Sequence, residues 1–163
     1  MLDYLSIFKE LNKKKIKYIV VGGMAVNFHG VPRMTYDIDL LVDLDNKNLR
    51  KFLSLMKEWN FKPMVPVDIM DFVKKSKRED WIKNKNMKAF NLKNPNWAIS
   101  EIDILIDTPI DYKKAKKNVV NYVLENVSIP TISVKDLITM KKTTGRKQDK
   151  DDITNLRKAI NAE

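Results

Sequence analysis

The sequence contains no cysteine and a single histidine, His29. Without cysteine the chain has no disulfide, no thiolate nucleophile, no cysteine-ligated zinc and no iron–sulfur cluster. One histidine cannot build a multi-histidine metal site, and we expect His29 to be a structural residue of a loop or helix end. Any enzymatic chemistry must therefore be carried by carboxylates, with or without a hard metal ion.

Long hydrophobic runs are also missing. The longest, residues 18–28, is interrupted by Gly22, Gly23 and Asn27, and it falls well short of the ~20 apolar residues that a membrane span requires. The first fifteen residues lack the apolar stretch of a signal peptide and instead predict an amphipathic helix. Its inner face would carry Leu2, Leu5, Phe8 and Leu11. We expect a cytoplasmic protein without a membrane partner.

The composition is that of a folded, positively charged chain. With 163 residues, 44% of them hydrophobic and 32% charged, we expect one globular domain spanning residues 1–163. The net charge is +10, and lysine accounts for 26 of the 31 basic residues. A lysine-based excess fits either a solvated surface or a role in binding nucleic acid or polyphosphate, and both readings stay open.

Hydrophobic periodicity predicts alternating strands and helices, and therefore an α/β (α+β) fold. Strands are expected at residues 17–21, 36–42 and 101–106, with a strand pair in 119–132. Helices are expected at 24–29, around 49–59, at 111–117, at 133–144 and from about 149. The core would span about residues 16–132, and the C-terminal helices about 133–161.

Two regions need separate comment. Residues 61–98 are broken by two prolines and have no clear role; one or two short helices at 74–88 and an edge strand at 87–92 are expected. In the C-terminal region, Ser133 is a candidate N-cap and Gly145 ends its helix. The last helix would bury one face, formed by Ile153, Leu156 and Ile160.

Two aspartates stand two residues apart in the apolar strand at 36–42. Because strand side chains alternate between faces, Asp37 and Asp39 point the same way, while the apolar residues between and after them point into the core. Two such carboxylates repel each other unless a cation lies between them. Oxygen ligands in this pattern suit Mg²⁺ or Mn²⁺, so the pair predicts a metal site.

A third acid is needed to complete such a site. Asp103 lies between two isoleucines on a strand suited to burial, where an unpaired carboxylate is costly. Glu101 and Asp107 are alternatives on the same segment. Three converging carboxylates suit two-metal phosphoryl transfer, in which one acid also accepts the proton of the attacking hydroxyl.

The strand at 17–21 ends in Gly22-Gly23 and is followed by a predicted helix. Glycines at this position let backbone N–H groups approach a phosphate closely. Neither the P-loop pattern nor the dinucleotide fingerprint is present. Taken alone, the glycine pair favours a plain tight turn over a phosphate-binding turn.

Together these residues resemble the signature of the polymerase-β-like nucleotidyltransferase superfamily, in particular its small minimal members, including those of toxin–antitoxin systems. The resemblance starts from Gly22-Gly23, Asp37-x-Asp39 and Asp103. Two further pieces are similar, namely Gly30-Val31-Pro32-Arg33-Met34-Thr35 and the C-terminal residues Asp136-Leu137-Ile138, Lys141, Gly145-Arg146, Asp149 and Asp152. The pieces occur in the family's order over about residues 18–153, with a longer segment at 44–98 than the simplest members have.

The resemblance implies a nucleotidyltransferase-type mixed β-sheet flanked by helices, and a metal-dependent enzyme. Asp37, Asp39 and Asp103 would hold Mg²⁺ or Mn²⁺, and Gly22 and Gly23 would cradle the phosphates of a nucleoside triphosphate, with ATP as the expected one. A nucleoside monophosphate would pass to a hydroxyl of a protein, a transfer RNA or a small molecule, and pyrophosphate would leave.

Four further residues have both a functional and a structural interpretation. Arg33 either neutralises phosphate or orients Asp37, and Thr35 either bonds a phosphate or simply suits a strand. Lys141 and Arg146 either bind the triphosphate or are surface cations, with Asp149 as a helix N-cap. The competing hypothesis for the whole chain is a non-catalytic nucleotide- or RNA-binding module, or an antitoxin-like regulator, on the same fold.

Overall fold

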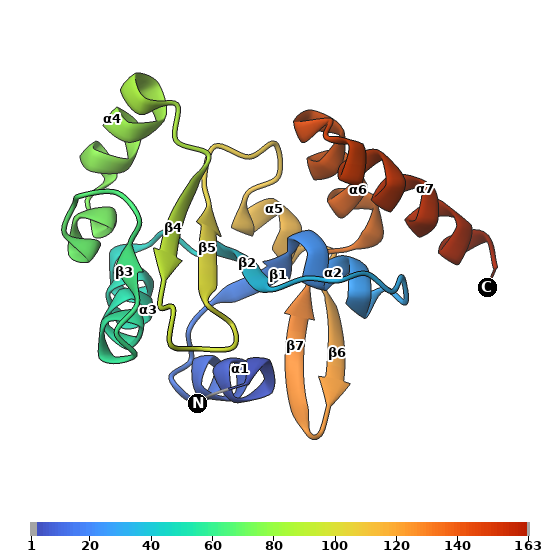
Figure 1. The fold of residues 1–163 in the computed structure, drawn as a ribbon, viewed down its shortest axis with the longest axis horizontal. Coiled ribbons are helices and arrows are strands. Elements are labelled where there is room, and N and C mark those ends of the chain that lie inside the picture. Colours follow the sequence, from blue (N-terminus) through green and yellow to red (C-terminus); the bar gives the residue numbers. More distant parts are fainter. Residues whose placement is uncertain (1–2, 163) are drawn as a thin grey trace.

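A computed structural model describes residues 3–162 (Figure 1). The strands in this part of the chain are β1 (Tyr18–Val21), β2 (Asp37–Val42), β3 (Lys62–Pro63), β4 (Ala89–Lys93), β5 (Glu101–Leu105), β6 (Val120–Leu124) and β7 (Val127–Thr131). The helices are α1 (Tyr4–Lys13), α2 (Gly22–Phe28), α3 (Asn46–Glu58), the 3₁₀ helix η1 (Ile69–Val73), α4 (Lys75–Lys85), α5 (Tyr112–Lys116), α6 (Val134–Thr144) and α7 (Lys147–Asn161). All seven strands join one mixed sheet in the order β3-β4-β5-β2-β1-β7-β6. The expected α/β fold, a mixed sheet flanked by helices, is confirmed.

The centre of the sheet is the parallel pair β2 and β5. Ile38 lies opposite Ile102 and Leu40 opposite Ile104, and all four side chains are fully buried. Side chains on a strand alternate between faces, so the acidic residues interleaved with them emerge on the other face of the sheet. The hydrophobic pattern of the two strands thus fixes one apolar face and one acidic face.

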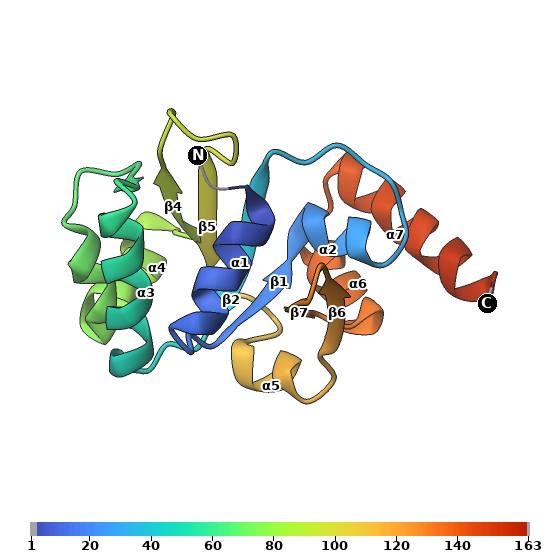
Figure 2. The same ribbon diagram turned by 90° about the horizontal axis from the view of Figure 1, so that it is seen from below.

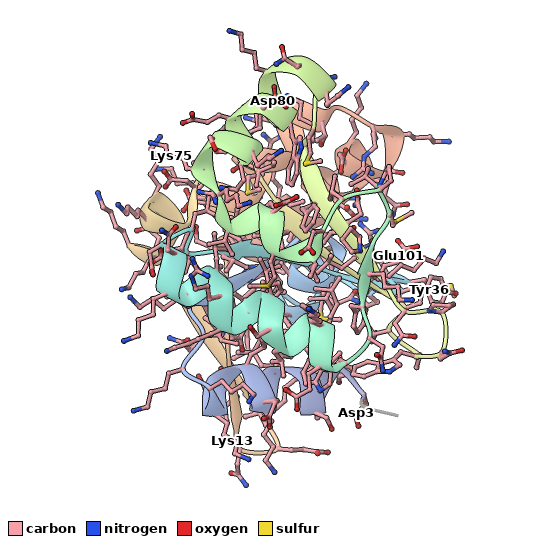
Figure 3. The ribbon with its side chains drawn as sticks, turned by 90° about the vertical axis from the view of Figure 1, so that its left-hand side faces the viewer. Asp3, Lys13, Tyr36, Lys75, Asp80 and Glu101 are labelled. Carbon is pink, nitrogen blue, oxygen red and sulfur yellow. The ribbon has the colours of Figure 1, made fainter. Side chains whose placement is uncertain are left out.

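The segment whose role was open, residues 61–98, completes the apolar side of the core. Phe90 of β4 pairs with Ile104 of β5 and stacks on Phe72 of η1, with ring centroids 4.6 Å apart. Trp81 of α4 stacks against Phe90, with ring centroids 5.7 Å apart. Figure 3 shows α3 and α4 in front of the strands on this side of the molecule.

The segment differs from expectation at β4. The edge strand expected at 87–92 lies instead between β5 and the two-residue strand β3. A two-residue strand containing Pro63 has too little pattern to be recognised in the sequence.

The N-terminal helix covers the sheet near β1 and β7 (Figure 2). The Asp3 side chain caps α1 by accepting the Ser6 N–H, and Phe8 stacks on Tyr18 of β1 with centroids 5.8 Å apart. Phe8 and Leu11 are fully buried as expected, whereas Leu2 lies outside the described residues. None of the helices in the described range has the length and hydrophobicity needed to cross a bilayer.

The two C-terminal helices pack against each other at one end of the molecule (Figure 1). Ser133 caps α6, and Gly145 ends it in the left-handed conformation, as expected. The final helix begins at Lys147, slightly before the predicted start. Its inner face was only partly predicted, because Leu156 is fully buried while Ile160 is 49% exposed.

Candidate active site

Two neighbouring strands bring the predicted acids together on the acidic face of the sheet. The parallel register of β2 and β5 places Asp39 opposite Asp103, and Asp37 opposite Glu101. Carboxylate oxygens of Asp37, Glu101 and Asp103 all lie within 4.8 Å of one another. Both candidates for the third acid, Asp103 and Glu101, are therefore in the cluster. The remaining alternative, Asp107, lies beyond β5 and pairs with Lys88.

The environments of the central pair disfavour their charged forms. Burial raises the pKa of Asp39 to about 7, and the charges of Asp37 and Asp103 add to the shift. Burial raises the pKa of Asp103 to about 6, with a hydrogen bond from Asn91 acting in the opposite direction. Perturbed carboxylates of this kind are typical of functional sites.

The donor set fits a hard divalent cation. All candidate ligands are carboxylate oxygens, which Mg²⁺ and Mn²⁺ prefer. The Oδ1 atom of Asp103 is buried and has no hydrogen-bond partner among the described residues. A buried carboxylate oxygen left unpaired is costly, and a bound cation would satisfy it. Asp37, Glu101 and Asp103 form the group that could hold such an ion. Asp39, predicted as a ligand, is not part of that group, although it lies opposite Asp103 in the strand register.

The glycine pair forms the first turn of α2, two residues earlier than the predicted helix. Gly22 has a φ of +65°, and a Cβ atom built on it would lie 2.0 Å from Oδ2 of Asp39. A Cβ on Gly23 would lie 3.0 Å from Cζ of Arg33 and 3.1 Å from Oγ1 of Thr35. Gly22 needs glycine because its φ is positive and Asp39 approaches it so closely, whereas a side chain at position 23 would require Arg33 and Thr35 to move by a few tenths of an ångström.

The loop before β2 supplies two of those neighbours. Thr35 donates a hydrogen bond from Oγ1 to Oδ1 of Asp37 at 3.1 Å. Arg33 donates from Nη1 to Oδ2 of Asp152 at 2.5 Å, and its backbone N–H is held by Asn27. The arginine therefore lies beside the glycine turn and is tied to the C-terminal helix.

The C-terminal helices bring two more predicted cations to the acids. Lys141 is only 6% exposed, and its Nζ lies 2.9 Å from Asp152 and 3.4 Å from Asp149. Its interpretation as a surface lysine is wrong. Arg146 keeps an exposed side chain but donates from Nε to Asp149 at 2.9 Å. Both cations oppose the rise in the pKa of Asp39, which places their charge near the acidic cluster.

Comparison with known proteins agrees with this arrangement. A family model described as "Nucleotidyltransferase of unknown function (DUF6036)" matches residues 3–162. The chain belongs to this nucleotidyltransferase family. No curated protein matches the sequence.

Solved structures share the fold of this chain at low sequence identity. A lincomycin-bound crystal structure of LnuA, a lincosamide antibiotic adenylyltransferase, has a TM-score of 0.62 and 18% identity over 93% of this chain and 92% of its own. A nucleotidyltransferase-type protein of Thermotoga maritima, TM1012, has a TM-score of 0.58 and 16% identity, covering 98% and 94%. An antigenic nucleotidyltransferase-like protein of Paracoccidioides brasiliensis has a TM-score of 0.55 and 14% identity, covering 97% and 73%.

The sequence pattern did not reveal how the last helix contributes to the site. Asp149, expected as an N-cap, is the third residue of α7, and its buried carboxylate accepts hydrogen bonds from Arg146 and Thr144. Asp152 is buried one turn later on the same helix face. The spacing of three residues between the two aspartates is the one local signal that they share a face.

Two other residues complete the description. Asn91 of β4 lies opposite Asp103 and bonds to it, a contact set by strand pairing that no local pattern indicates. His29 is a structural residue, as expected. Its Nδ1 lies 2.6 Å from the Tyr122 hydroxyl, and its Nε2 lies 2.7 Å from the Ile132 carbonyl oxygen.

Proposed function

We propose that the protein is a metal-dependent nucleotidyltransferase that moves a nucleoside monophosphate from a nucleoside triphosphate to a hydroxyl and releases pyrophosphate. One observation carries this proposal: Asp39 and Asp103 face each other on β2 and β5, directly beside the glycine turn. ATP is the proposed donor, which the adenylyltransferase activity named for LnuA supports. We propose a cytoplasmic location, because ATP is available to an enzyme there.

Asp37, Asp39 and Asp103 are the proposed ligands of Mg²⁺ or Mn²⁺, which when bound stabilises the charge on the attacking and leaving oxygens. Asp103 also accepts the proton of the acceptor hydroxyl. The acceptor oxygen bonds to the α-phosphorus, and the bond from that phosphorus to the pyrophosphate oxygen breaks.

The phosphate-binding side is built from the glycine turn and its cationic neighbours. The backbone of Gly22 and Gly23 leaves room for a phosphate, and Thr35 offers a hydroxyl next to Asp37. Arg33, Lys141 and Arg146 supply positive charge for the triphosphate and the departing pyrophosphate. The net charge of +10 favours the approach of such a polyanion.

The acceptor is a hydroxyl of a small molecule, of a protein, as in toxin–antitoxin pairs, or of an RNA end. The deciding experiment incubates the purified protein with Mg²⁺, each of four α-labelled triphosphates and cell lysate, followed by mass spectrometry of the labelled species. Asp37→Asn is the matched inactive variant. Label transfer by the wild type alone supports the proposal. Equal labelling by both proteins, or salt-sensitive RNA binding without transfer, contradicts it and favours a binding module.

A further inference from the structure

We propose that Asp152 is a positioning residue that holds Arg33 and Lys141 in place for the phosphates of the substrate. This inference rests on the proposed function, because it names the residue that organises the phosphate-binding side of that site. Asp152 itself does not touch the reacting atoms.

The contacts converge on one buried oxygen. The Asp152 side chain is 3% exposed, and its Oδ2 lies 2.5 Å from Nη1 of Arg33 and 2.9 Å from Nζ of Lys141. The three residues come from the loop before β2, from α6 and from α7. Arg33 and Asp152 are 119 residues apart in the chain. The carboxylate therefore joins the two segments that carry the cations.

Both cations lie close to the proposed site. The Arg33 guanidinium carbon lies 3.0 Å from the place where a Cβ of Gly23 would be, so it lies against the first turn of α2. The positive charge of Lys141 lowers the pKa of Asp39, the residue of β2 that approaches Gly22 most closely. A triphosphate bound between the glycine turn and the acids would meet both cations.

Fixing these side chains has a physical purpose. Arginine and lysine each lose much rotamer freedom on binding, and a pre-formed contact removes part of that cost. Asp152 engages one N–H of Arg33, whose guanidinium has five, so donors remain for phosphate oxygens. Lys141 has three N–H donors and two carboxylate partners, which leaves one donor.

The test compares Asp152→Asn with Asp151→Asn in the full chain. Asp151 is the adjacent, exposed aspartate, so its substitution removes the same charge without the contacts. The probe is an ATP analogue whose α,β-bridging oxygen is replaced by a methylene group, so that the bond cleaved in nucleotidyl transfer cannot break, with Mg²⁺, and the readout is its Kd by calorimetry. Loss of an outer contact of this kind weakens binding about 10-fold, so we expect that change for Asp152→Asn and less than about 2-fold for Asp151→Asn. In turnover assays KM should rise more than kcat falls.

A double-variant cycle separates positioning from general damage. In an Arg33→Met background, Asp152→Asn should weaken binding of the analogue clearly less than it does in the wild type. One of the two cations that Asp152 positions is already absent from that background. An equal effect in both backgrounds, or an unchanged Kd in Asp152→Asn, overturns the inference.

If Asp152→Asn does not fold, Asp152→Glu replaces it. That variant keeps the charge and moves the carboxylate by one methylene. A folded Asp152→Glu protein with weakened binding upholds the inference, and one with wild-type Kd overturns it. Failure of the proposed function looks different, because the wild type itself would then fail to transfer a nucleotide from ATP, whether or not it binds the analogue.

Discussion

Asp39 lies directly opposite Asp103 in the parallel register of β2 and β5, on the face of the sheet that points away from the apolar core. The two residues are far apart in the sequence, yet pairing of two strongly apolar strands brings their carboxylates side by side. The same alternation that buries the isoleucines therefore concentrates negative charge. The repulsion between these carboxylates, together with their burial, affects the stability of the protein and its dependence on pH.

The first prediction concerns stability without metal. Asp39→Asn should raise the free energy of unfolding of the metal-free protein at pH 8 by about 1–2 kcal/mol, because it removes a charge that burial and two neighbouring acids disfavour. The same substitution should abolish transfer. Chemical denaturation in EDTA measures the first effect, with Asp151→Asn as the control. Mg²⁺ should raise the melting temperature of the wild type but not of Asp39→Asn, and an equal rise in both would count against these ligands.

The pH dependence of the metal-free protein follows from the same shifts. The folded-state pKa values of Asp39 and Asp103, about 7 and about 6, exceed the ordinary value of 3.8. The folded state therefore binds these protons more tightly, and the stability they contribute is present below pH 4 and is lost as the pH rises through 6 to 7. Comparing wild type with the Asp39→Asn/Asp103→Asn protein from pH 4 to pH 8 isolates this contribution. A wild type that gains stability relative to the double variant over that range would contradict it.

Gly22 should be sensitive to a single methyl group. Gly22→Ala puts a Cβ 2.0 Å from Oδ2 of Asp39, so the carboxylate or the turn must move, and transfer should fall at least 100-fold. The matched control is Gly30→Ala. Gly30 also has a positive φ, +88°, but nothing lies within 4 Å of its Cβ position. That variant should lose about 1 kcal/mol of stability and keep its kcat. Similar kcat values for the two variants would show that the close approach to Asp39 is unimportant.

The third acid can be assigned by comparing two substitutions. Asp103 is buried with an unpartnered oxygen, whereas Glu101 is partly exposed and lies 3.5 Å from Lys93. Asp103→Asn should therefore lower kcat about 100-fold or more, and Glu101→Gln about 10-fold at most. Steady-state kinetics at saturating Mg²⁺ measures both. The reverse order would assign the role to Glu101.

His29 should matter for stability but not for turnover. Its ring contacts the Tyr122 hydroxyl and the Ile132 carbonyl, and burial lowers its pKa. His29→Phe should lower the free energy of unfolding by about 1–2 kcal/mol through the lost hydrogen bonds. The kcat value at a temperature where the variant is folded should match the wild type. A large loss of kcat would give the histidine a catalytic role.

Local sequence pattern predicted the strands of the site well. The alternation around Asp37 and Asp39 and the isoleucines flanking Asp103 indicated which faces are buried, and the register confirmed that these acids meet. The glycine pair was ambiguous because its purpose lies in contacts with Asp39 and Arg33, which the local sequence does not contain.

Site residues that the sequence pattern did not identify depend on contacts between distant parts of the chain. The burial of Lys141 depends on two carboxylates of the next helix, and lysine spacing alone resembles a solvated face. The bridge from Asp152 to Arg33 joins two residues that are 119 positions apart in the sequence. Asn91 reaches Asp103 only because β4 pairs with β5. Pairing partners of this kind are set by the tertiary fold.

The most direct test of the nucleotidyltransferase mechanism is the fate of each phosphate of ATP. Wild-type protein is incubated with Mg²⁺, an acceptor-containing lysate, and ATP labelled at either the α- or the γ-phosphorus. The mechanism predicts that the α-label becomes attached to an acceptor while the γ-label appears in pyrophosphate, and that Asp39→Asn does neither. Attachment of the γ-label to an acceptor would contradict it, as would release of the γ-label as free phosphate without α-label transfer.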